Sequence, residues 1–319
     1  MHNAEAAPAI DWRNSMEQQQ LLTWQSLPPM PFAEWEDTRL YWQLMSQILG
    51  KIRLELHPKI NHWWHVPLYV TPRGTTTSTI PYRESNFDIE LDLTEHRLVL
   101  RTGDGQVLGF DLDGRPIADY YSHLFGILES VGIDVEILAK PYLCKSTEPF
   151  ATDRIHATYD SEAIHRGWTI LKRIEPIFKE FRSRFIGKCS PVHQFWHSFD
   201  LACTRFSGRR APDMGITDPV SREAYTHECI SAGFWFGDDD LPQPAFYSYT
   251  WPAPAGLDQQ PLKPVEAFWR EVHGSPQATL LYDDLRKMEN PHTALLDFMQ
   301  SSYEAGANLA GWNRTELER

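Results

Sequence analysis

One order of predicted elements occurs twice along the chain, and it limits the folds that the chain can adopt. Residues 31–49 and 161–186 place apolar side chains at helical spacing, and a Gly-Lys pair follows each. In both halves β-like segments come next, and a further helix pattern follows them. The strand connections are of hairpin length, which favours antiparallel pairing because parallel strands need long crossovers. We therefore predict an α+β fold of two tandem pseudo-repeats, each helix, antiparallel sheet and helix, packed together.

A match between two ten-residue segments supports the repeat. Residues 64–73 and 196–205 align without a gap and share Trp-His at the start and Arg at the end. The identities are few, so a chance match stays an alternative. On this basis residues 1–30 are expected to form a flexible N-terminal arm, residues 31–150 the first α+β repeat and residues 151–319 the second.

The local patterns predict the individual elements. Helix patterns cover residues 31–49, 117–131, 161–186, 265–271 and 291–309, and strand patterns cover residues 52–56, 65–71, 87–93, 96–102, 107–112, 133–138, 192–206, 225–236 and 245–251. Gly50 is expected to end the first helix. The clearest strand is Phe87 to Leu93, where apolar residues alternate with acids that are predicted to face water.

Charge and motifs exclude several classes of partner. With 30 Lys and Arg against 43 Asp and Glu the net charge is −13, which argues against nucleic acid and anionic membranes. No apolar run of about 18 residues suits a membrane helix. Residues 1–20 lack the pattern of a secretory signal, so a cytoplasmic protein is expected. No phosphate-binding glycine motif occurs, so no nucleotide cofactor is indicated. The oligomeric state stays open.

Four segments carry a family resemblance. They are residues 61–70, 187–193, 199–202 and 242–247. These segments resemble an uncharacterised bacterial family of unknown function, over roughly residues 27 to 312. The resemblance implies a soluble bacterial protein and no particular activity, so it assigns no catalytic residue.

Histidines are the main candidates for chemistry. His193 and His197 are four apart in a predicted strand, which places them on one apolar face. His227 lies on the next strand, and His65 is the repeat equivalent of His197. Because buried imidazoles need partners, we consider a metal, a carboxylate or backbone carbonyls. The metal hypothesis takes His193, His197 and His227 as ligands of one Fe, Zn or Mn ion.

Two carboxylates complete this candidate site. Glu228 follows His227 and is predicted to act as a base or ligand, with His65 as a further acid or base. Asp200 lies in an apolar strand, and strand parity turns it away from His197. It is predicted either to orient a catalytic group or to be a solvent-facing acid, with Arg205 or Arg209 as its partner.

Basic and aromatic residues suggest how a substrate is held. Residues 205–210 are predicted to form a basic turn in which Arg205 and Arg209 grip an anion, and Arg73 lies at the matching place in the first half. Aromatic residues crowd the predicted strands, and those chosen as substrate-binding are Trp64 and Trp196. The alternatives are ordinary surface loops and ordinary core packing.

Three functional hypotheses follow. The first is a small-molecule enzyme with a His-rich, mononuclear metal site between two pseudo-symmetric halves, acting on a small anionic or aromatic substrate, with oxidoreductase and hydrolase chemistry both open. The second is a metal-free protein that binds a small molecule. The third is a non-catalytic interaction protein.

Overall fold

The computed structural model describes residues 27–213 and 215–319, so most of the predicted N-terminal arm lies outside the described residues. In the described part, seven α-helices and two six-stranded antiparallel sheets form a mixed helix and sheet structure, which confirms the α+β class. None of these helices is both long enough and apolar enough to span a membrane.

The first half holds the first sheet. Helix α2 (Phe32–Leu56) precedes its strands, the short helix η2 (Asn61–Trp63) follows α2, and α3 (Ile117–Ser130) comes after the last strand. The strands are β1 (Tyr69–Val70), β2 (Gly74–Thr76), β3 (Ile80–Tyr82), β4 (Ser85–Asp92), β5 (Arg97–Thr102) and β6 (Val107–Asp111). Their order in the sheet is β1-β2-β4-β5-β6, and β3 also pairs with β4.

The second half holds the second sheet. The short helix η3 (Phe150–Thr152) precedes helix α4 (Ser161–Ser183). Asp160 caps α4, since its side chain accepts hydrogen bonds from the first-turn amides of Glu162 and Ala163. The remaining elements are β7 (His193–Phe195), β8 (Asp200–Arg210), α5 (Pro219–Ala224), β9 (His227–Trp235), β10 (Ala245–Trp251), η4 (Leu257–Gln259), β11 (Phe268–Val272), β12 (Ser275–Leu281), α6 (Tyr282–Leu285), α7 (Pro291–Leu309) and α8 (Arg314–Leu317). The strand order is β11-β12-β10-β9-β8-β7.

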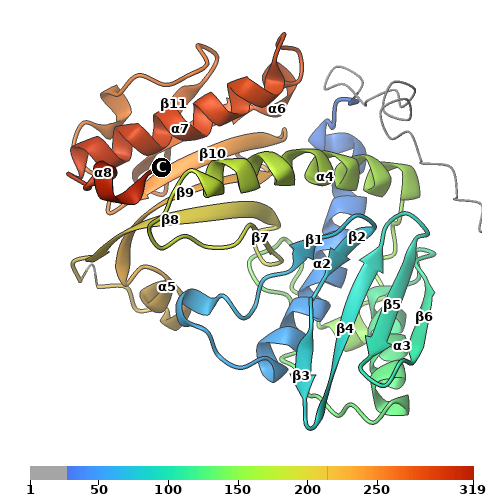
Figure 1. Ribbon diagram of the computed structural model, residues 1–319. Coiled ribbons are helices and arrows are strands. Elements are labelled where there is room, and N and C mark those ends of the chain that lie inside the picture. Colours follow the sequence, from blue (N-terminus) through green and yellow to red (C-terminus); the bar gives the residue numbers. More distant parts are fainter. Residues whose placement is uncertain (1–26, 214) are drawn as a thin grey trace, which may run out of the picture.

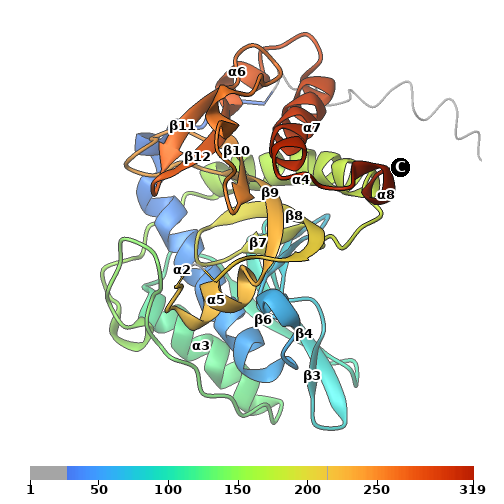
Figure 2. The same cartoon turned by 90° about the vertical axis from the view of Figure 1, so that its left-hand side faces the viewer.

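The two sheets meet at one backbone bridge. Leu68, just before β1, and Gln194 in β7 exchange two N–H···O bonds of 2.9 Å. Helices α4 and α7 pack on one face of the second sheet, while α2 crosses the middle of the molecule (Figures 1 and 2). The first sheet lies at the opposite end, beside α3. Segments around residues 60–68 therefore run alongside the second sheet, where they help to form a pocket.

Strand β4 follows its predicted alternation, with one correction. Its apolar side chains are buried in the core as expected. The prediction that its acids face water is wrong for Glu90 and Asp92, which are also buried. Arg101 lies 2.5 Å from Glu90 and Arg73 lies 2.6 Å from Asp92, so ion pairs compensate the burial of both carboxylates.

Several predicted boundaries are wrong. Residues 52–56 continue helix α2, residues 133–138 have no strand assignment, and residues 265–271 contain the start of β11 where a helix was expected. The predicted strand 192–206 is broken by a turn at residues 196–199, in which Phe199 has a φ of 56°. This turn changes which face each neighbouring side chain occupies.

Gly50 does not end its helix, because it serves a close contact inside α2. A Cβ on Gly50 would overlap the indole of Trp196, which is buried and donates a 3.0 Å hydrogen bond to the Val66 carbonyl. Glycine at this position therefore lets α2 approach the turn that follows β7.

We expect Gly50→Ala to lower the free energy of unfolding by about 1–3 kcal/mol, because the added methyl group displaces a packed indole. The matched control is Gly126→Ala on the exposed side of α3, where a Cβ would meet nothing within 4 Å. That control should raise stability by about 0.5–1 kcal/mol through helix propensity. Urea unfolding of the two variants measures both effects, and equal stabilisation by both would contradict the packing argument.

Candidate functional site

A pocket of about 680 Å³ lies on the face of the second sheet that α4 and α7 leave uncovered. The small side chains of β8 and β9 form its floor, and its walls come from η2, the turn at residues 196–199, α5, β11 and the aromatic side chains of β8, β9 and β10. Residues of both halves line it, since His62 to Trp64 and Leu143 precede the second sheet in the chain. We call it the aromatic pocket because of its walls.

Strand alternation explains the floor. In β8 the side chains of Ala202 and Thr204 face the pocket, and in β9 those of Cys229 and Ser231 do so. These side chains are small, so the floor is recessed below the aromatic walls. The hydroxyls of Thr204 and Ser231 bond to each other at 2.9 Å, which leaves the floor only weakly polar.

Large rings form the walls. They come from Trp63, Trp64, Phe195, Phe206, Tyr225, Trp235, Tyr247 and Tyr249. Tyr247 and Tyr249 lie nearly parallel at a centroid distance of 6.1 Å, and the Tyr225 hydroxyl bonds to that of Tyr249 at 2.9 Å. Such walls favour a ligand with a flat ring, because stacked and edge-to-face contacts add to the burial of apolar surface.

Tyr247 holds its position because its strand partner is Gly233. The two residues are paired in the β10–β9 register, and a Cβ on Gly233 would overlap the tyrosine ring. The ring therefore lies across the bare backbone of β9 and reaches the start of β8. There its hydroxyl donates a hydrogen bond to Asp200.

Asp200 is the buried acid of the pocket. Its carboxylate accepts hydrogen bonds from the hydroxyls of Tyr247 and Ser198, and its side chain is almost fully buried. Burial raises the pKa of Asp200, and the two hydroxyl donors oppose that rise. The predicted partners Arg205 and Arg209 are wrong, since neither lies against this carboxylate. The expectation that Asp200 faces away from His197 is also wrong, because both line the pocket.

His197 lies in the turn beside Asp200. Its ring stacks on Tyr142 at 6.1 Å and meets Phe195 edge-on at 5.7 Å. Among the described residues its ring nitrogens have no hydrogen-bond partner. Burial lowers the pKa of His197 to about 4, so the imidazole is neutral at physiological pH and free to accept a hydrogen bond.

The other predicted histidines lie apart from this pair. His193 is fully buried behind the pocket lining, against the rings of Trp64 and Tyr69. His65 accepts a 3.2 Å hydrogen bond from the backbone amide of Ile60 and stacks on Trp63. His227, at the start of β9, lies beside His62 with a ring distance of 5.6 Å.

No metal centre is therefore assembled in this arrangement. Within residues 27–213 and 215–319, no group of three His, Cys, Asp or Glu side chains is placed to hold an ion. The expected shared face of His193 and His197 does not form, because His193 lies in β7 and His197 in the turn that follows it. A metal at these residues stays a prediction that would need side chains to move.

Glu228 and Arg209 form a structural pair. Arg209 lies 2.7 Å from Glu228 and donates hydrogen bonds to the carbonyls of Ala310 and Gly311, just beyond α7. The Ser207 hydroxyl also bonds to Glu228, at 2.9 Å. This contact ties the end of β8 to the end of α7, outside the pocket lining, so neither residue occupies the role predicted for it.

Arg205 is not part of a basic turn, because β8 continues through residues 200–210. Its side chain faces the helices opposite the pocket, where the guanidinium lies 3.5 Å from the ring centroid of Phe181 and 4.5 Å from that of Tyr303. Arg73 pairs with Asp92 in the first sheet. Neither arginine lines the pocket, and the predicted anion grip between the two loops does not form.

Of the two predicted substrate-binding tryptophans, Trp64 lines the pocket and Trp196 packs against α2. Lys188 lies over the rings of Trp64 and Phe206 at 5.3 and 5.2 Å, and its ammonium lies 2.8 Å from His62 Nε2. The end of the pocket near Trp64 therefore already has a cation.

The residues that sequence reasoning missed come mainly from turns and short elements. Ser198, Tyr225 and Arg270 line the pocket but lie outside every pattern that pointed to chemistry. The one signal in the sequence that pointed to the pocket was the high density of aromatic residues in the predicted strands, among them Trp235, Tyr247 and Tyr249. Which of these rings face the pocket depends on strand register, which the sequence does not carry.

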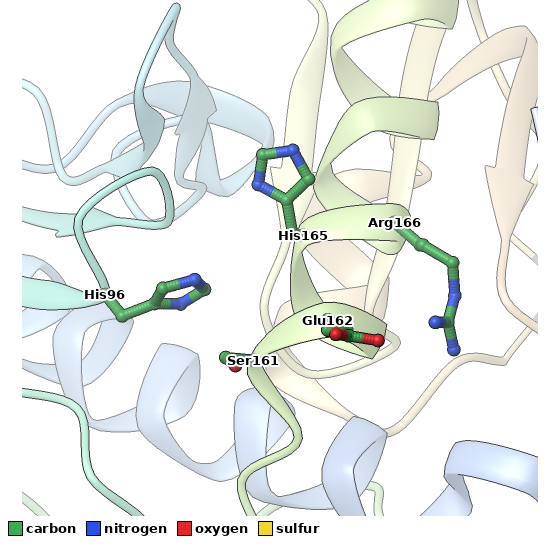
Figure 3. A pocket seen from close by; sticks show the side chains of 5 residues that line it. All are labelled: His96, Ser161, Glu162, His165 and Arg166. Carbon is green, nitrogen blue, oxygen red and sulfur yellow. The ribbon is translucent and has the colours of Figure 1, made fainter.

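A second hollow, of about 370 Å³, lies at the start of α4. Ser161, Glu162, His165 and Arg166 come from the first turns of the helix, and His96 comes from the turn between β4 and β5 (Figure 3). The Arg166 side chain extends away from His96, which bonds to the Tyr159 hydroxyl at 2.7 Å. Most of the lining is exposed to solvent, so this hollow is a weaker candidate than the aromatic pocket.

Comparison with known proteins gives one match. The model of a family described as a family of unknown function (DUF5996) matches residues 27–319. No curated protein and no solved structure matches the chain. The match covers all of the elements described above.

Proposed function

The chain belongs to the DUF5996 family of unknown function, and from its own pocket we propose that it binds a small organic molecule with a flat ring, without a metal ion. The observation that carries this proposal is a cavity of about 680 Å³ walled by aromatic rings, with Asp200 and His197 as polar groups at one end. Mostly apolar pockets with a few placed polar groups are the usual form of small-molecule sites.

The size of the pocket supports a ligand of modest dimensions. Cavities of roughly 300–1,000 Å³ typically bury most of a small ligand's surface. The recessed floor of Ala202 and Ser231 gives a ring room to lie between the aromatic walls. Asp200 and His197 can then fix its orientation through hydrogen bonds, since each has acceptor capacity left.

The test is binding of neutral ring compounds, with indole and 2-phenylethanol as probes in ligand-observed NMR. We expect both to bind, and we expect Ala202→Leu to weaken binding at least about tenfold, because the added side chain projects into the cavity. The matched control is Ala151→Leu on the exposed surface of η3, which should leave binding unchanged. Extraction of the freshly purified chain, followed by mass spectrometry, looks for a retained molecule.

The proposal fails if neither probe binds and no retained molecule is found. It also fails if Ala202→Leu and Ala151→Leu behave alike, since the binding would then lie elsewhere. A folded Ala202→Leu variant is recognised by an unchanged circular dichroism spectrum, so loss of binding is not confused with unfolding.

A second candidate function is catalysis in the same pocket. It is favoured by the position of Asp200, held by two hydroxyls, near a neutral His197 whose ring nitrogens have no partner among the described residues. A carboxyl with a raised pKa in the same pocket as a neutral imidazole suits proton transfer. Turnover of the retained molecule, lost in His197→Gln, would move the proposal from binding to catalysis.

The internal duplication also remains a proposal. Its support is that each half has one helix before and one after six antiparallel strands, but the order of the strands differs between the two sheets, and α5 interrupts the second set. A cytoplasmic location, expected from the sequence, likewise stays a prediction.

A further inference from the structure

The buried carboxylates of the described residues differ in whether a basic side chain pairs with them. Four are buried, and three of them lie against a basic side chain, in the pairs Glu90–Arg101, Asp92–Arg73 and Asp153–His156. Within residues 27–213 and 215–319, Asp200 has no such partner within 4.0 Å. Its contacts are the hydroxyls of Ser198 and Tyr247.

An unpaired carboxylate is costly inside a protein, since hydrogen bonds from neutral groups only partly replace its hydration. Asp200 faces the cavity, so a ligand can supply the missing charge. Each of its oxygens accepts one hydroxyl hydrogen bond and keeps a second acceptor direction open. The structure therefore leaves room for a donor that carries positive charge.

The aromatic rings around Asp200 also favour a positively charged ligand. Trp235 is its strand partner, and Tyr247 meets Trp235 at a centroid distance of 5.6 Å. Aromatic faces attract organic cations through their quadrupole, most strongly where water is excluded. Lys188 already covers Trp64 and Phe206, and Arg270 lies over Trp235 at 5.9 Å, whereas no cation of the described residues lies over Tyr247.

We propose that the aromatic pocket selects an organic cation, an amine that carries a flat ring, whose ammonium group pairs with Asp200 while its ring lies between the aromatic walls. This inference rests on the proposed function, and it names the class of ligand. It replaces the anionic substrate predicted from the arginines, since Arg73, Arg205 and Arg209 do not line the cavity.

The two other formally charged side chains of the lining, Asp238 and Arg270, carry opposite charges. Asp238 is exposed at the rim and adds negative charge. Arg270 is the opposing group, and it lies over Trp235 at 5.9 Å. The imidazoles of His62 and His197 favour their neutral forms, because burial lowers the pKa of both.

Three probes of one shape and different charge test the inference. Isothermal titration at pH 7.5 compares phenethylamine, 2-phenylethanol and phenylacetate. We expect phenethylamine to bind at least about tenfold more tightly than 2-phenylethanol, and phenylacetate to bind most weakly. This comparison uses the unaltered chain, so it does not depend on a variant that folds.

Asp200→Asn then identifies the group responsible. We expect it to remove the preference for phenethylamine, so that phenethylamine and 2-phenylethanol bind to the variant with affinities within about threefold of each other. The matched control is Asp297→Asn, the same loss of charge on the exposed side of α7, which should keep the preference.

Each other outcome has a distinct meaning. If 2-phenylethanol binds as tightly as phenethylamine, the inference is overturned and the proposed function stands. If phenylacetate binds most tightly and Arg270→Gln removes that affinity, the site takes an anion and the inference is also overturned. If no probe binds and indole does not bind either, the proposed function itself fails.

Discussion

Replacing Gly233 with alanine is expected to lower the free energy of unfolding by about 2–3 kcal/mol and to abolish binding in the aromatic pocket. In an unobstructed strand the same change would stabilise, because alanine loses less backbone entropy than glycine. Here the added Cβ would overlap the ring of Tyr247, which is buried between Trp235 and Tyr249. The ring must move, and its hydrogen bond to Asp200 is lost with it.

A double-mutant cycle isolates this contact. Tyr247→Leu in the Gly233→Ala background removes the overlapping ring, so the two changes together should cost less than the sum of the single changes. Urea unfolding gives the coupling energy, which we expect to be about 1–2 kcal/mol in favour of the double variant. Additive effects would mean that Gly233 does not position Tyr247, and the geometry of the pocket would then need another explanation.

The elements set by local periodicity could be predicted from the sequence. Helix α7 and strand β10 begin and end where their patterns do, and α3 ends one residue early. In the two helices the side chains that face the core recur at helical spacing, so the signal is contained in the segment itself. Gly50 shows where prediction from local patterns fails. The residue that requires glycine inside α2 is Trp196, which is more than a hundred positions away in the sequence.

The candidate site was less predictable for the same reason. The sequence singled out Asp200, His197 and Trp64, which line the pocket, but it assigned their faces by assuming one continuous strand from residue 192 to residue 206. The turn at Phe199, whose left-handed φ the sequence does not announce, reverses that assignment. The pairing of Tyr247 with Gly233 is a matter of register between distant strands, which a single sequence does not contain.

His193 is expected to make the fold sensitive to acid. Its imidazole is buried, and neither ring nitrogen has a hydrogen-bond partner. Burial lowers its pKa to about 3, and the nearby positive charges of Arg53 and Arg182 act in the same direction. In the unfolded chain a histidine titrates near its ordinary pKa of about 6.5.

The sign of the effect follows from these two pKa values. Above about pH 6.5 the imidazole is neutral in both states, and it contributes no pH dependence. Between about pH 6.5 and 3 the unfolded chain binds a proton that the folded chain does not, so stability falls as the pH falls. At about 1.4 kcal/mol per pKa unit, the full loss is about 5 kcal/mol, and about 3 kcal/mol of it has occurred at pH 4.

His193→Phe should remove this loss, because phenylalanine keeps a ring among Trp64, Tyr69 and Phe195 and cannot bind a proton. Near pH 7.5 we expect the variant to be at least as stable as the unaltered chain, since no hydrogen bond is given up. At pH 4 it should be more stable by about 3 kcal/mol in urea unfolding. His197, which also titrates with a lowered pKa, is present in both proteins, so its contribution cancels.

The control for acid sensitivity is His165→Phe, the same change at an exposed position on α4. Its stability should follow that of the unaltered chain across the whole pH range, because the side chain of residue 165 is exposed and its replacement leaves the core unchanged. If the free energies of unfolding of His193→Phe and of the unaltered chain differ by the same amount at every pH from 7.5 to 4, His193 is not held neutral in the folded protein. Its two unpartnered nitrogens would then have to be in contact with water or with a ligand that enters from the aromatic pocket beside it.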